Sequence, residues 1–164
     1  MHHEVLAWVE RHGATADPVT VLEIGARDVN GTVRHLFPHA TRYIGVDLTD
    51  GPSVDIVADA ADLDLGETFD IVVSTEVLEH TERWRDIVRR AAAHLNPGGR
   101  LSLTAAGPGR GAHGADGSPA PHPGEWYENV APADLRTVLE ACGLVDIVVD
   151  VHGADVRAYA AKGR

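Results

Sequence analysis

Short runs of β-branched and aliphatic residues recur along the 164-residue chain, and most of them end at a polar residue or a glycine. Such runs are typical of buried strands, whereas apolar residues spaced three to four positions apart are typical of amphipathic helices. The pattern predicts helices at 3–12, 32–37, 81–95 and 132–141, and strands at 19–24, 42–46, 54–58, 70–74, 100–104, 144–151 and 156–161.

The order of these elements predicts the fold class. Strands that alternate with helices form a mostly parallel sheet with helices packed on its faces. The last two predicted strands are separated only by 152–155, a spacing that suits an antiparallel hairpin. We therefore expect an α/β sandwich with a mostly parallel seven-stranded sheet and a C-terminal antiparallel hairpin, in a single domain that spans 1–164.

The stretch 107–124 is dense in glycine and proline and has no hydrophobic periodicity. It is too long to be a plain connection between two elements. We interpret 107–131 as a loop on the substrate side of a binding site, because loops held by a rigid scaffold often carry function. The alternative is a disordered insertion.

Charge and cysteine content narrow the choice of partners and compartment. The formal net charge is −11, so the chain would repel a phosphate backbone, and we do not expect nucleic acid as a partner. The single cysteine, Cys142, allows no internal disulfide, which suits a reducing cytoplasm. There is neither a run of membrane-spanning length nor a signal-peptide pattern, so we expect a cytoplasmic protein without membrane contact. The oligomeric state stays open.

The first predicted strand ends at Glu23-Ile24-Gly25, and this end is a candidate ligand site. Ligands of open α/β sheets bind at the carboxyl ends of strands, and a glycine lets a ligand approach the backbone closely. An ordinary strand-to-helix turn would have the same local pattern. The segments that follow decide between the two interpretations.

Several segments of the chain resemble those of one protein family and occur in the same order. The resemblance covers nearly the whole chain. The chain resembles class I S-adenosylmethionine-dependent methyltransferases in LEIGARDVNG (22–31), YIGVD (43–47), VADA (57–60), FDIVVSTEVLEH (69–80) and LNPGGRLSLT (95–104). The resemblance implies a Rossmann-like three-layer sandwich and S-adenosylmethionine as the cofactor.

The resemblance also implies how the methionine part of the cofactor would be bound. Gly25 and Ala26 would line it, and Glu23 would help to hold the amino group. The backbone of Ser74 would face the same amino end. A dinucleotide enzyme needs later glycines for a pyrophosphate, but Arg27 and Val29 replace them here, which counts against a nicotinamide oxidoreductase.

Four further residues are implied at the adenosine part. Asp47 would accept hydrogen bonds from both ribose hydroxyls, since a carboxylate offers two acceptor oxygens. Leu48 would pack on the adenine. Asp59 would accept from the adenine amino group, and the backbone of Ala60 would meet a ring nitrogen.

The segment Glu76-Val77-Leu78-Glu79-His80 is a candidate metal site. If it begins a helix, its two carboxylates and its imidazole lie on one face. That set suits Mg²⁺ or Mn²⁺, and the nitrogen ligand favours a transition metal or Zn²⁺. The alternative is an ordinary helix start, where acidic residues complement the helix dipole.

The same E-x-x-E-H pattern resembles the metal site of small-RNA 3′-terminal 2′-O-methyltransferases and of ubiquinone-biosynthesis O-methyltransferases. In the RNA group a further histidine precedes a Glu-Trp pair by three residues, as His122 precedes Glu125-Trp126 here. The resemblance therefore implies a ligand set of Glu76, Glu79, His80 and His122.

Without a metal, a general base must come from the loop or its neighbours, and the candidates are His113, His122 and Tyr127. We expect an enzyme that transfers a methyl group from S-adenosylmethionine to an oxygen, or a nitrogen, of a small-molecule acceptor. Two alternatives stay open: an RNA 3′-terminal 2′-O-methyltransferase, and a non-catalytic cofactor-binding partner subunit.

Overall fold

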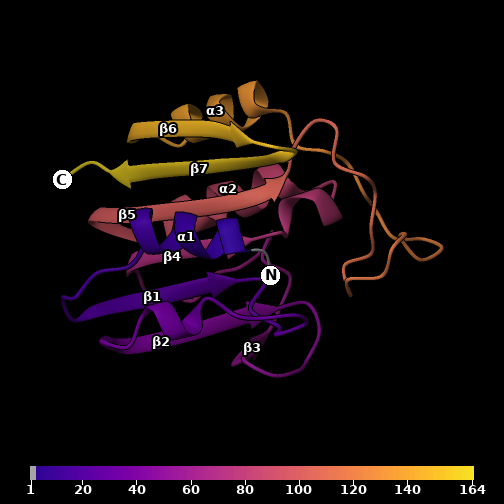
Figure 1. Ribbon diagram of the computed structural model, residues 1–164. Helices are drawn as coiled ribbons and strands as arrows, with labels where there is room; N and C mark the ends of the chain where they lie inside the picture. Colours follow the sequence, from indigo (N-terminus) through magenta and orange to yellow (C-terminus); the bar gives the residue numbers. More distant parts are fainter. Residues whose placement is uncertain (1–2) are drawn as a thin grey trace.

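The aliphatic runs form one seven-stranded sheet in the computed structural model, which describes residues 3–164 (Figure 1). The strand order is β3-β2-β1-β4-β5-β7-β6. Neighbours from β3 to β5 are parallel, whereas β7 is antiparallel to both β5 and β6. The predicted fold class is therefore confirmed. The strands are β1 (Val19–Ile24), β2 (Ala40–Asp47), β3 (Ile56–Val57), β4 (Phe69–Thr75), β5 (Leu95–Ala106), β6 (Leu144–His152) and β7 (Asp155–Lys162).

Helices cover both faces of the sheet and bury its aliphatic residues. Successive strand residues point to opposite faces, so each central strand supplies two cores. Val21 of β1 packs with Val9 of α1 (His3–His12), whereas Leu22 belongs to the larger core with α2 (Trp84–Ala93) and α3 (Pro132–Ala141). This arrangement gives the three layers seen in Figure 1.

The helix predicted over 81–95 is shorter in the structure. The side chain of Thr81 accepts a hydrogen bond from the backbone N–H of Arg83 (3.0 Å) and forms a separate turn before α2. The helix then runs only over Trp84–Ala93, and β5 begins directly afterwards. Trp84 is buried in the larger core.

Two other predicted elements are shorter in the structure than in the prediction. The helix predicted over 32–37 is one 3₁₀ turn, η1 (Arg34–Leu36). The strand predicted over 54–58 is reduced to β3, and Asp55 before it bonds to Gly45 of β2 through both its backbone N–H (2.8 Å) and its side chain. Its Oδ2 accepts the N–H of Gly45 at 2.8 Å.

The loop 107–131 leaves β5 at the edge where the parallel strands end, and it contains neither helix nor strand (Figure 1). It is tied down at both ends. Arg110 forms an ion pair with Asp155 of β7, and the N–H of Val130 donates to the carbonyl of Ala106 (2.8 Å). The loop is therefore held against the sheet edge at which ligands of this fold class bind. Within 3–164, no helix has the length and apolarity needed to cross a membrane.

Candidate active site

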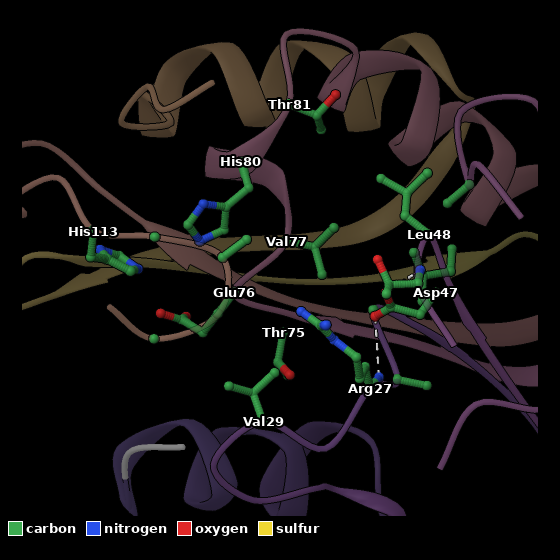
Figure 2. Close-up of a pocket in the computed structure, with 18 of the residues that line it drawn as sticks. Arg27, Val29, Asp47, Leu48, Thr75, Glu76, Val77, His80, Thr81 and His113 are labelled. Atoms are coloured by element: carbon green, nitrogen blue, oxygen red, sulfur yellow. Dashed lines mark hydrogen bonds between the residues drawn. The ribbon is translucent and has the colours of Figure 1, made fainter. Parts of the chain in front are cut away.

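A cavity of about 700 Å³ lies at the carboxyl ends of β1, β2 and β4 and under the loop 110–119. Ligand pockets of proteins typically measure about 300–1,000 Å³, so it can hold a molecule of cofactor size. Figure 2 shows side chains from these segments directed into one space. Most residues that were predicted to hold the cofactor line the cavity: Glu23, Gly25, Ala26, Asp47, Leu48, Asp59 and Ala60.

Gly25 makes the sharp turn that opens the cavity. Its φ of 79° lies in the left-handed region, and a Cβ at this position would lie 2.0 Å from Cγ2 of Val77. The N–H groups of Gly25 and Ala26 both donate to the carbonyl of Val46, at 2.8 and 3.1 Å. A side chain at position 25 is therefore excluded by backbone conformation and by packing.

Asp47, for which a ribose-binding role is predicted, lies at the end of β2 and accepts two backbone hydrogen bonds. Its Oδ2 accepts the backbone N–H of Arg27 (3.1 Å), and its Oδ1 accepts that of Thr49 (3.0 Å). These bonds fix the carboxylate while each oxygen keeps a further acceptor position. Leu48 beside it is 68% exposed and offers an apolar surface at the rim of the cavity.

Glu23 is a buried acid that lines the cavity and is only 2% exposed. Tyr43 donates a hydrogen bond to its Oε2 at 2.7 Å. Burial raises the pKa of Glu23 to about 7, against the lowering effect of that hydrogen bond. A bound ammonium group would favour the ionised carboxylate, so Glu23 fits the amino end of the cofactor.

Asp59 is more heavily engaged than its predicted role requires. Its Oδ1 accepts the N–H of Ala61 at 2.8 Å, and its Oδ2 pairs with Arg83 at 3.0 Å. Ser74 is fully buried in β4 and is not among the residues of 3–164 that line the cavity. Its predicted role through the backbone stays a prediction.

No helix begins at Glu76, so the condition under which the candidate ligands would share one helix face is not met. Glu76 has a φ of 56°, and a single 3₁₀ turn, η2 (Leu78–His80), follows it. The backbone N–H of Glu76 bonds to the carbonyl of Thr104 (2.9 Å), and its carboxylate accepts the hydroxyl of the same threonine (2.9 Å). Bonds to β5 thus replace the first helical turn, so the helical spacing that placed three ligands on one face does not apply.

Glu79 and His80, which follow Glu76 in the chain, each have a buried polar atom that lacks a hydrogen-bond partner within 3–164. Glu79 is fully buried, and its Oε1 accepts the N–H of Ala106 (3.1 Å). Oε2 of Glu79 and Nδ1 of His80 are buried without a hydrogen-bond partner in the described part of the chain. Burial and the nearby carboxylate of Glu76 raise the pKa of Glu79. Burial, followed by the proximity of His113, lowers the pKa of His80 to about 4.

His113 completes a group that we call the Glu79–His80–His113 cluster. One potential ligand atom from each residue lies within 4.8 Å of the other two. The rings of His80 and His113 meet edge to face with centroids 5.0 Å apart, and both contact the ring of Tyr127. Buried polar atoms are normally satisfied, so the unsatisfied atoms on two residues of this cluster are consistent with a bound cation.

His122 lies outside this cluster. Its Nε2 pairs with Asp116 at 2.9 Å, and its side chain is 56% exposed. The bond to Asp116 raises the pKa of His122. Tyr127 donates its hydroxyl to the carbonyl of Gly111 (3.1 Å), and burial raises the pKa of this phenol to about 12. The structure thus brings His113 to Glu79 and His80, where the sequence-based ligand set had Glu76 and His122.

A second cavity, of about 390 Å³, adjoins the first and shares His80 and Thr81 with it. Trp126, 43% exposed, forms part of its wall together with Glu125. Sequence reasoning also missed a residue of the larger cavity, Arg27, which it treated only as a lost glycine. Figure 2 shows the Arg27 side chain pointing into the cavity toward Thr75 and Val77.

Several solved structures share this fold. A Burkholderia thailandensis 1,6-didemethyltoxoflavin-N1-methyltransferase, with bound S-adenosylhomocysteine, has a TM-score of 0.69 at 20% identity, over 99% of this chain and 78% of that one. A Synechocystis magnesium protoporphyrin IX methyltransferase, also with S-adenosylhomocysteine, has a TM-score of 0.66 at 18% identity, over 98% and 81%. A Haemonchus contortus phosphoethanolamine N-methyltransferase 2 has a TM-score of 0.72 at 16% identity, over 98% of this chain but only 52% of that chain.

At these identities the structural neighbours show the fold alone. The chain also spans only about half the length of the Haemonchus enzyme. No curated protein sequence matches it. The model of a family described as a methyltransferase domain, however, matches residues 1–148, which is most of the chain. Together with the strand order and the cavity at the strand ends, this match assigns the chain to the class I S-adenosylmethionine-dependent methyltransferases.

Proposed function

We propose that the chain transfers the methyl group of S-adenosylmethionine to an oxygen of a small-molecule acceptor at the Glu79–His80–His113 cluster. One observation carries the proposal: one potential ligand atom from each of Glu79, His80 and His113 lies within 4.8 Å of the other two, beside a cavity of cofactor size. Glu79 and His80 also each have a buried atom without a hydrogen-bond partner in the described part of the chain. His80 and His113 also line that cavity. A hydroxyl held there would lie next to the methyl donor.

The donor set of the cluster supports a divalent cation at this position. Two imidazoles and one carboxylate favour Mn²⁺ or Zn²⁺ over Mg²⁺, which prefers oxygen ligands. Such an ion, when bound, lowers the pKa of an acceptor hydroxyl. The lowered pKa of His80 keeps its imidazole neutral at pH 7, which is the form that acts as a metal ligand or accepts a hydrogen bond.

Methyl transfer requires mainly that the protein align the reacting oxygen, carbon and sulfur atoms. The acceptor hydroxyl gives up its proton to solvent water, its oxygen forms a bond to the methyl carbon, and the bond from that carbon to sulfur breaks, which leaves S-adenosylhomocysteine. Holding oxygen, carbon and sulfur in line removes much of the barrier. His80 belongs to both cavities and so stands where donor and acceptor would meet.

The second cavity supports a flat and uncharged or cationic acceptor. The exposed indole of Trp126 offers a surface for stacking. Glu82 and Glu125 add negative charge to the wall, whereas the Arg83 charge is paired with Asp59 and Asp62. An anionic acceptor would be repelled here, so hydroxylated aromatic rings such as catechols fit better than carboxylic acids.

Calorimetric titration of Mn²⁺ and of Zn²⁺ into protein saturated with S-adenosylhomocysteine tests the proposal. We expect one-to-one binding that His113→Ala weakens by at least tenfold and that His122→Ala leaves unchanged. Weakening by His122→Ala alone would restore the sequence-based ligand set and reject the cluster.

The methyl-transfer proposal has its own test. We expect methylation of catechols or vicinal diols that a chelator abolishes and that Mn²⁺ or Zn²⁺ restores. Methylation that proceeds unchanged with chelator, in protein that binds neither ion, would reject the cation and leave the oxygen acceptor standing. Turnover of amines but not of hydroxyls would reject the oxygen acceptor.

A further inference from the structure

Several acidic residues line the larger cavity, and their negative charge would repel an anionic group of a ligand. Glu23, Asp47, Asp59 and Glu76 all border it. The amino-acid end of S-adenosylmethionine carries an ammonium and a carboxylate. Glu23 suits the ammonium, but a carboxylate in the same space needs a cation beside it, because like charges at short range in a partly buried site repel strongly.

Within 3–164, two arginines and no lysine line this cavity. Arg110 is committed to the loop, since it forms an ion pair with Asp155 and lies 4.0 Å from the carboxylate of Glu76. Arg27 differs from it. Its Nε is buried without a hydrogen-bond partner, and its side chain makes no ion pair with any residue of the described range.

The backbone and the aliphatic stem of Arg27 are positioned by the fold. Its backbone N–H donates to Asp47, so the residue starts at the carboxylate that fits the ribose. Its stem packs on Gly51, where an added Cβ would lie 3.0 Å from Cγ and 3.1 Å from Cδ of Arg27. From there the guanidinium extends toward Thr75 and Val77, at the carboxyl end of β4 (Figure 2).

We propose that Arg27 binds the carboxylate of the cofactor's amino-acid end. A guanidinium is always charged, and its planar fork matches a carboxylate with two parallel hydrogen bonds. Arg27 would thus stand where the family often has a second glycine in the loop after β1. Its guanidinium would add a direct ionic contact to the cofactor carboxylate. The inference rests on S-adenosylmethionine as the cofactor and is independent of the acceptor and of the cation.

Calorimetry with two probes isolates this contact. S-adenosylhomocysteine carries the carboxylate, and S-adenosyl-3-thiopropylamine, its decarboxylated analogue, lacks only that group. We expect wild-type protein to bind S-adenosylhomocysteine at least tenfold more tightly than the analogue. Arg27→Gln should remove this preference by weakening S-adenosylhomocysteine about 10- to 100-fold and leaving the analogue nearly unchanged.

Arg42→Gln is the matched control, because it removes the same charge from an exposed ion pair with Glu67, away from the cavity. It should keep the wild-type preference. Binding of the analogue shows that the Arg27→Gln protein is folded. A wild-type protein that binds both probes equally, or an Arg27→Gln protein that keeps the preference, overturns the assignment. If wild-type protein binds neither probe, S-adenosylmethionine is rejected as the cofactor, and the role of Arg27 is rejected with it.

Discussion

The buried carboxyl of Glu23 makes the stability of the ligand-free protein depend on pH. Its pKa in the folded state, about 7, lies above the value of about 4.5 in the unfolded chain. Between these values the folded state holds the extra proton, so the free energy of unfolding falls as pH rises from about 4.5 through 7. At pH 8 the ionised carboxylate costs roughly 3 kcal/mol.

Glu23→Gln should remove this cost, because an amide keeps the acceptor for Tyr43 without titrating. We expect the ligand-free variant to be more stable than wild type by up to roughly 3 kcal/mol at pH 8, and to differ little at pH 5. Urea unfolding at the two pH values measures the difference. An equal pH dependence in both proteins would show that Glu23 does not carry this proton.

Gly25 combines two constraints that one pair of variants can separate. Gly25→Ala adds a Cβ that would lie 2.0 Å from Val77 and forces alanine into a left-handed conformation with a φ of 79°. We expect a loss of stability of about 2–4 kcal/mol and a matching loss of cofactor affinity. Adding Val77→Ala should recover the part due to the clash. No recovery would mean that backbone conformation alone requires the glycine. Thermal unfolding and calorimetry measure both effects.

At the scale of elements, sequence periodicity succeeded where packing is regular. The helices 3–12 and 132–141 and the strand 19–24 begin and end where the pattern placed them. The helical spacing considered for Glu76 does not apply, because Glu76 bonds to Thr104 of the neighbouring strand β5 and has a left-handed conformation. A bond to a residue 28 positions along the chain has no signature in the local sequence, so the conformation of Glu76 could not be predicted from it.

We expect a single substitution to loosen the loop 107–131, since Arg110 joins it to Asp155 and to Glu76. Arg110→Ala should raise amide hydrogen exchange across 111–119, because these residues cover the cavity without secondary structure of their own. Arg85→Ala removes an exposed ion pair with Asp134 and should leave this exchange unchanged. Exchange in 111–119 that stays at the wild-type level in Arg110→Ala would contradict the anchoring role.

For the molecule as a whole, the sequence was most informative about the half of the site that the sheet builds. Parallel strands end at one edge, so residues that follow them, such as Glu23 and Asp47, meet there whatever the loops do. His113 could not be placed in the same way. It reaches Glu79 and His80 through an irregular loop whose path depends on distant contacts, as at Arg110. The residues that line the cavity at the strand ends were thus predictable, whereas the loop residue that joins Glu79 and His80 was not.

The most direct test of the account is the binding of S-adenosylhomocysteine to wild-type protein and to Asp47→Asn, measured by calorimetry. Asp50→Asn is the control, an exposed acid on the same loop outside the residues that line the cavity. We expect one-to-one binding to wild type and to Asp50→Asn, and a 10- to 100-fold loss in Asp47→Asn, where one acceptor oxygen and the charge are gone. Equal affinity in all three proteins, or no binding to wild type, would contradict a cofactor site at the carboxyl ends of β1 and β2.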